Sequence, residues 1–90
     1  MTVSYYITFP TTYFALRAEN LLKNQPFMFK MVPVPRRISS SCGTALRCGC
    51  EEITAVREYL RHNGLELEGL YRLEEIGLQV SSVEELQLNE

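Results

Sequence analysis

The sequence predicts a single α+β domain in which two helices pack on one face of one antiparallel sheet. The chain has 90 residues, the length of one domain. Short segments rich in β-branched and aromatic residues alternate with two longer segments whose apolar residues recur every three to four positions. Prolines and glycines separate these segments, as they do at the ends of helices and strands.

The first part of the chain predicts a strand, a helix and a second strand. Residues 3–9 are rich in Val, Tyr, Ile, Thr and Phe, which is typical of a strand. In residues 13–24 the apolar side chains share one helical face. The helix ends before Pro26, because the residue before a proline is disfavoured in helical conformation. Residues 27–34 return to an alternating apolar pattern, which two prolines close.

The middle of the chain predicts a loop, a third strand, a second helix and a fourth strand. Residues 36–43 form a polar, serine-rich loop, and residues 44–50 a short strand. Residues 51–63 carry a second apolar stripe, and Gly64 is a common stop signal for such a helix. Residues 65–73 supply the fourth strand. This order is the split βαβ arrangement of ferredoxin-like folds, βαββαβ.

The remaining residues, 74–90, are predicted to form a tail outside the domain of residues 1–73. Ser82 is followed three residues later by Glu85, a spacing that would cap one short closing helix. The predicted sheet therefore has four strands, and the tail adds at most one helix to it.

Composition excludes several classes of function. The formal net charge is −2, so the chain lacks a basic surface for nucleic acid. It has no run of about 18 apolar residues and no signal-peptide pattern, so we expect no membrane partner. Three cysteines without an export signal favour a reducing, cytoplasmic location over a disulfide scaffold. No zinc spacing, phosphate loop or dinucleotide fingerprint is present, so we expect neither a metal nor a cofactor.

The loop between the second and third strands contains the main candidate for chemistry. Cys42 follows three serines and precedes Gly43, a polar and flexible setting in which we expect an exposed thiol. Arg36 and Arg37 are close in sequence, and positive charge favours the nucleophilic thiolate. Backbone N–H groups from Ser41 to Gly43 would form a small anion-binding concavity. The alternative is a surface turn in which the cysteine is incidental.

The other two cysteines are interpreted as structural. Cys48 and Cys50 would point to the same side of the third strand as Leu46, so we expect both to be small core residues. A sharper alternative is that one of them lies near Cys42 and resolves an oxidised or persulfidated sulfur.

Two stretches of the sequence carry a family resemblance. They are Pro-Val-Pro-Arg at residues 33–36 and Ser-Ser-Cys-Gly at residues 40–43. With them, residues 4–68 resemble a family of small bacterial proteins described as selenium/sulfur carrier protein-like. The resemblance implies a carrier whose Cys42 holds sulfur or selenium as a persulfide or selenosulfide, with Arg36 at the family's arginine. It also implies a cysteine desulfurase as donor and an acceptor protein as recipient, and so a carrier rather than an autonomous enzyme.

The sequence is also compatible with two other functions, a binding module and a thiol redox sensor. In a binding module, the loop from Pro35 to Gly43 would bind an anion or a partner peptide, and an exposed sheet edge would pair with a second copy. In a thiol redox sensor, Cys42 would form a reversible disulfide with Cys48 or Cys50 and would have a lowered pKa.

Overall fold

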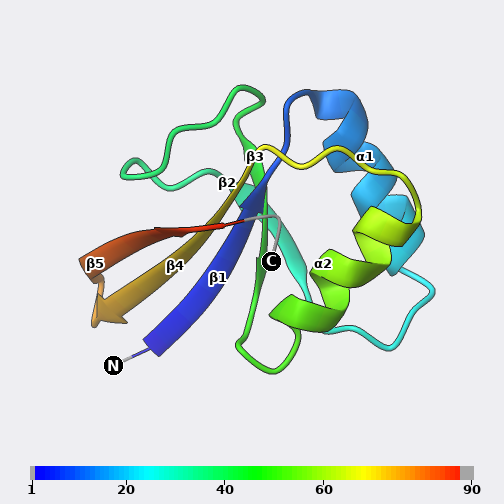
Figure 1. Ribbon diagram of the computed structural model, residues 1–90. Helices are drawn as coiled ribbons and strands as arrows, with labels where there is room; N and C mark the ends of the chain where they lie inside the picture. The colour runs from blue at the N-terminus through cyan, green and yellow to red at the C-terminus, as the bar shows by residue number, and fades with distance from the viewer. Residues whose placement is uncertain (1, 88–90) are drawn as a thin grey trace.

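The structure, a computed structural model, describes residues 2–87 and contains one five-stranded antiparallel sheet with two helices on one face (Figure 1). The elements follow the chain in the order β1 (Thr2–Thr8), α1 (Thr12–Leu22), β2 (Lys30–Pro33), β3 (Thr44–Cys48), α2 (Ile53–His62), β4 (Gly69–Ile76) and β5 (Gln79–Leu86). The α+β class is therefore confirmed, but the sheet has five strands where the sequence predicted four.

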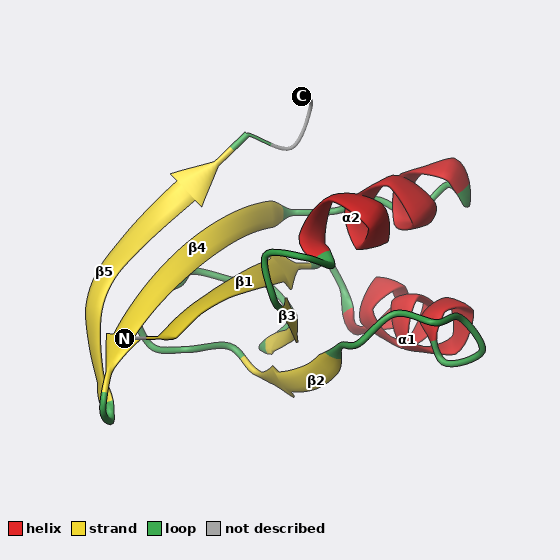
Figure 2. Ribbon diagram, turned by 90° about the horizontal axis from the view of Figure 1, so that it is seen from below, coloured by secondary structure: helices red, strands yellow, loops and turns green. Residues whose placement is uncertain are grey.

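The sheet is centred on β1. Its strand order is β2-β3-β1-β4-β5, and each neighbouring pair is antiparallel. In the view of Figure 2 the helices form one layer and the curved sheet a second, with β5 at its outer edge. Both β3 and β4 pair with β1, so the segments that precede β3 and β4 meet at the end of the sheet where β1 finishes.

The C-terminal segment corrects the sequence prediction. The expected tail with a short helix is a strand, β5, which forms a hairpin with β4 through a turn at Gly77. Val80 and Val83 are three residues apart, a helical spacing, yet both pack on the same face of the sheet. A register irregularity opposite Glu74 and Glu75 makes this possible, because a bulge shifts the alternation of side chains by one residue.

Side chains on the two faces of the sheet form two separate cores. Consecutive residues of β1 belong to different ones, since Ile7 faces the helices and Tyr6 faces away. The helix-side core consists of Ile7, Phe9, Ala15, Ala18, Leu22, Leu46, Cys48, Ile53, Val56, Leu60, Leu65 and Leu70. The smaller loop-side core consists of Tyr6, Ile38, Ala45 and Leu73.

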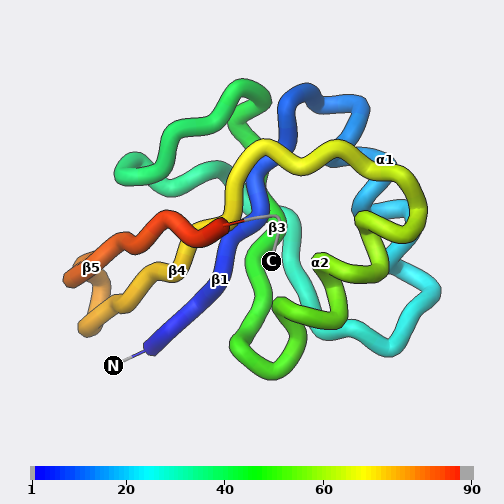
Figure 3. Tube along the Cα trace, viewed as in Figure 1, coloured from blue at the N-terminus to red at the C-terminus, as the bar shows by residue number. Residues whose placement is uncertain are grey.

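The loop between β2 and β3 supplies Ile38 to the loop-side core, where this side chain is 5% exposed. Figure 3 shows this loop and the two helices on opposite sides of the sheet. The loop is therefore packed onto the protein and is more than a solvated turn. Within residues 2–87, neither helix is long and apolar enough to cross a membrane.

Candidate functional site

Cys42 lies in the turn that leads into β3, and its side chain is half-buried, where the sequence predicted an exposed one. It packs against the helix-side core, and its Sγ donates a hydrogen bond to the Thr44 carbonyl at 3.2 Å. The Val34 N–H donates to the Gly43 carbonyl at 3.0 Å, which continues the β2–β3 ladder up to the residue after Cys42. Gly43 has φ of +78°, a conformation that glycine adopts without strain. The sheet therefore holds the thiol from its C-terminal side.

Ser41 donates two hydrogen bonds to the carboxylate of Glu68. Its backbone N–H lies 3.0 Å from Oε1, and its hydroxyl donates to Oε2. These bonds stabilise the charged carboxylate and so lower the pKa of Glu68 below its ordinary value. Of the backbone N–H groups from Ser41 to Gly43 that were expected to bind an anion, the one of Ser41 contacts a carboxylate of the same chain. No local pattern could have identified Glu68, because it is 27 residues from Ser41 and only the pairing of β1 with β3 and β4 brings them together.

Arg36 and Arg37 are both exposed, and Arg37 is held away from the thiol. Its Nη1 donates to the Val80 carbonyl of β5 at 3.0 Å. Val80 packs on the loop-side core, whereas Cys42 packs on the helix-side core. The structure therefore does not bring the Arg37 guanidinium and the Cys42 sulfur together.

A polar hollow of about 390 Å³ lies beside the serines of the loop. Its walls include Ser41, Glu68, Tyr71 and Glu85. Burial and, secondarily, the carboxylates of Glu85 and Glu68 raise the pKa of Tyr71. The charges that line this hollow are therefore acidic, unlike the basic surroundings expected from the two arginines.

The other cysteines differ from each other. Cys48 is a core residue, as predicted, and burial raises the pKa of its thiol to about 12. Cys50 is exposed, so its predicted place in the core is wrong. The reason is that β3 ends at Cys48 and a turn begins at Cys50, which interrupts the expected alternation.

All three cysteines are free thiols, and β3 separates Cys42 from the other two. A five-residue strand spans about 13 Å, and the bond from Val34 to Gly43 carries Cys42 further along the same direction. A disulfide needs Cα atoms within about 7 Å. The proposed internal disulfide of a redox sensor is therefore incompatible with this fold.

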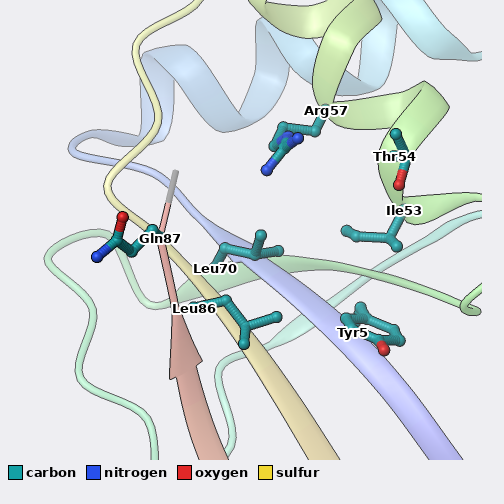
Figure 4. Close-up of a pocket in the computed structure, with 7 residues that line it drawn as sticks. All are labelled: Tyr5, Ile53, Thr54, Arg57, Leu70, Leu86 and Gln87. Carbon is teal, nitrogen blue, oxygen red and sulfur yellow. The ribbon is translucent and has the colours of Figure 1, made fainter. Parts of the chain in front are cut away.

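A second hollow, of about 430 Å³, lies between α2 and the sheet and does not include Cys42 (Figure 4). Tyr5, Leu70 and Leu86 line its sheet side, and Ile53 and Arg57 line its helix side. Figure 4 shows the Arg57 side chain extending from α2 toward the sheet. Among residues 2–87 no group of His, Cys, Asp or Glu side chains is arranged to hold a metal ion.

Comparison with known proteins identifies the family. The model of the family described as "Putative Se/S carrier protein-like" matches residues 4–72, which include Cys42, Glu68, most of β1 and all of α1, β2, β3 and α2. No curated protein and no solved structure matches the chain. Since the match spans most of the 90 residues, the chain belongs to this family of Se/S carrier-like proteins.

Proposed function

We propose that the protein is a sulfur or selenium carrier that holds the chalcogen on Cys42 as a persulfide or selenosulfide. The observation that carries this proposal is the isolation of a free, half-buried thiol at the end of the β2–β3 hairpin. A second thiol nearby would attack a persulfide, form a disulfide and release hydrogen sulfide. Cys48 is the last residue of β3 and Cys50 follows the strand, so both are a strand's length from Cys42 and a persulfide on Cys42 would persist until an external acceptor arrives.

The proposed transfer is a thiol–disulfide-type exchange in which atoms and charges balance. The Cys42 thiolate attacks the terminal sulfur of a persulfide on a cysteine desulfurase, and the desulfurase thiolate leaves. Cys42 then carries the terminal sulfur as a persulfide. In the second step an acceptor thiolate attacks that terminal sulfur, and the Cys42 thiolate leaves. Neither step needs a metal or a net oxidant, which fits a carrier rather than an autonomous enzyme.

The half-buried position of Cys42 supports this role. The residue packs against the helix-side core but is only partly buried, which would leave a path for an attacking persulfide. A fully buried thiol such as Cys48 would be inaccessible, and its raised pKa would keep it protonated. We further propose that transfer takes place in the cytoplasm, where thiols remain reduced.

We also propose that β1 to β4 with the two helices form a ferredoxin-like unit and that β5 is an addition to it. Antiparallel pairing of β1 with both β3 and β4 supports this assignment, as does the chain order strand, helix, strand, strand, helix, strand. Fold alone does not supply the reaction, so the carrier proposal depends on Cys42 and the family match.

The proposal is tested by loading the protein with a cysteine desulfurase and cysteine, followed by mass spectrometry of tryptic peptides. Cleavage after Arg37 and Arg47 places Cys42 in the peptide 38–47 and the other two cysteines in the peptide 48–57. We expect one added sulfur on the first peptide, its loss in Cys42→Ser, and no change in Cys50→Ser. An unloaded Cys42, while an established carrier is loaded in the same experiment, would refute the proposal.

A binding module is the second candidate, and the Ser41–Glu68 contact favours it. The loop already binds a carboxylate through a backbone N–H and a hydroxyl, so it can recognise the acidic group of a peptide once Glu68 moves away. Under this alternative, Cys42→Ser leaves partner binding intact and no sulfur is carried. Under the carrier proposal, the same substitution abolishes transfer.

A further inference from the structure

Glu68 connects the end of β1 to the residue that precedes Cys42. Its backbone N–H donates to the Thr8 carbonyl at 2.8 Å, which fixes Glu68 at the end of β1. Its carboxylate then accepts the two hydrogen bonds from Ser41. The geometry therefore ties the Cys42 turn to the central strand of the sheet.

These contacts restrain Cys42 on both sides. On the C-terminal side, the bond from Val34 to Gly43 holds the turn to β2. On the N-terminal side, the backbone N–H and the hydroxyl of Ser41 both donate to the carboxylate of Glu68. Loss of the Glu68 carboxylate would free the N-terminal side and leave the other side in place.

The surroundings of the Glu68 carboxylate are acidic. Glu85 of β5 lines the same hollow, and Tyr71 of β4, whose pKa is raised, is neutral at physiological pH, so no positive charge among the described residues of the hollow opposes these carboxylates. In the structure the thiol donates a hydrogen bond to the Thr44 carbonyl, a contact available to the protonated form.

We infer that Glu68 is a positioning residue that keeps Cys42 in a resting geometry of low reactivity, and that a basic side chain of the sulfur donor or acceptor would release it by pairing with the carboxylate. The inference rests on the proposed function in that it takes Cys42 as the carrier thiol. The hollow of about 390 Å³ beside Glu68, with Glu85 on its wall, gives a lysine or arginine side chain room and opposite charge. Loading is thereby coupled to contact with the correct partner.

Alkylation of the native protein tests the inference with an internal control. Cys50 is exposed beyond the other end of β3, and trypsin separates it from Cys42 at Arg47. We expect Glu68→Gln to raise the alkylation rate of Cys42 by iodoacetamide about fivefold, from the loss of charge-assisted hydrogen bonds at an exposed site, while the rate of Cys50 is unchanged. Glu66→Gln removes an exposed carboxylate two residues away and should change neither rate.

Two further readouts separate positioning from general loosening of the fold. Ser41→Ala removes only the hydroxyl contact and should give an intermediate rise at Cys42. With a disulfide reagent that reacts in acid, the ratio of Cys42 to Cys50 rates should rise in the wild type as the pH falls through the titration of Glu68, and should stay flat in Glu68→Gln.

An unchanged Cys42 rate in Glu68→Gln would overturn the inference, and so would an equal rise at Cys50. Alkylation needs no sulfur donor, so this result is independent of whether Cys42 can be loaded. A protein that is never loaded but shows the Glu68 effect would retain the positioning role and lose the carrier function. A protein that is loaded on Cys42 but shows no Glu68 effect would retain the carrier function and lose the positioning role.

Discussion

The two ends of β3 present thiols in opposite ways. Before the strand, Cys42 is half-buried between Ser41, which Glu68 holds, and Gly43, which Val34 holds. After the strand, Cys50 is exposed in a turn, and its Sγ lies 3.8 Å from the neighbouring Glu51 carboxylate. The neighbours of the first thiol are restrained by Glu68 and Val34, which are distant in sequence, whereas the hydrogen bond of the second thiol is to the next residue of the chain.

This difference shows that exposure alone does not mark a functional cysteine. Cys50 is the most exposed of the three thiols, and Cys48, two residues earlier, is sealed in the helix-side core. Cys42 is distinguished by what fixes the residues on either side of it. The two ends of β3 should therefore differ in reactivity, backbone strain, titration and anchoring.

The largest expected effect separates the two thiols at the C-terminal end. Burial raises the pKa of Cys48 to about 12, so at pH 8 its thiolate fraction is roughly a thousandfold below that of an ordinary cysteine. We expect iodoacetamide to modify Cys50 of the folded protein at least about a thousandfold faster than Cys48. Fragmentation of the tryptic peptide 48–57 locates the label. In urea both thiols should react at similar rates, and similar rates in the folded protein would contradict the prediction.

The two glycines that flank β3 should respond differently to alanine. Gly43 has φ of +78°, so Gly43→Ala places a Cβ in the left-handed region and should lower the free energy of unfolding by about 1–2 kcal/mol. Gly49 does not have a positive φ, and an added Cβ would lie 3.9 Å from Glu51 Oε1, an ordinary contact. Gly49→Ala should therefore change stability by less than about 0.5 kcal/mol. Urea unfolding measures the stability of both variants. Equal losses of stability would show that the two glycines do not differ in backbone strain.

The Ser41–Glu68 contact should make stability depend on pH. Its hydrogen bonds lower the pKa of Glu68 in the folded protein relative to the unfolded chain. The contact therefore stabilises the fold above the unfolded pKa of about 4.3, and this contribution is lost as the pH falls through the lowered folded pKa. Because the carboxylate is exposed to solvent, we expect less than about 1 kcal/mol.

The measurement is the difference in unfolding free energy between wild type and Glu68→Gln, followed from neutral pH into acid. The difference should favour the wild type at neutral pH and shrink toward acid. Glu66→Gln, at an exposed carboxylate nearby, serves as the matched control. If the difference in unfolding free energy did not vary with pH, the charge of Glu68 would not contribute to the Ser41–Glu68 contact.

The smallest effect concerns the anchoring of the loop before Cys42. Arg37 donates to the Val80 carbonyl, so Arg37→Ala should cost about 0.5 kcal/mol and speed amide exchange in β5. Arg36 is exposed beside it, and Arg36→Ala should leave β5 exchange unchanged. Hydrogen exchange measured by mass spectrometry compares the two variants. Equal exchange in both variants would mean that the bond from Arg37 to Val80 does not anchor the loop to β5.

Much of the fold could be predicted because the signals for β1 to β4 and both helices are local. Composition, apolar spacing, proline and Gly64 all act within a few residues of the element they define. The fifth strand could not be predicted in the same way. The bulge in the β4–β5 hairpin gives Val80 and Val83 a helical spacing, and only the pairing partner shows that they share a sheet face.

The candidate site was predicted in part, and for the same reason. The position of Cys42 in a loop held by a hairpin follows from adjacent residues. Its surroundings depend on residues far away in sequence, because Glu68 reaches Ser41 and Arg37 reaches Val80 through the tertiary fold. The arginines close to Cys42 in sequence therefore led to the expectation of basic surroundings, whereas the charged group bonded to the neighbouring Ser41 is the Glu68 carboxylate.

The fifth strand also determines where the chain can be shortened. The family match ends at residue 72, inside β4, and the predicted domain ended at residue 73, yet β5 pairs with β4 along almost its whole length. A chain cut there would leave the edge of β4 that faces away from β1 without a partner strand, beside Leu70. Open strands of this kind recruit strands from other molecules, so such a fragment should aggregate even with its helices and Cys42 loop intact.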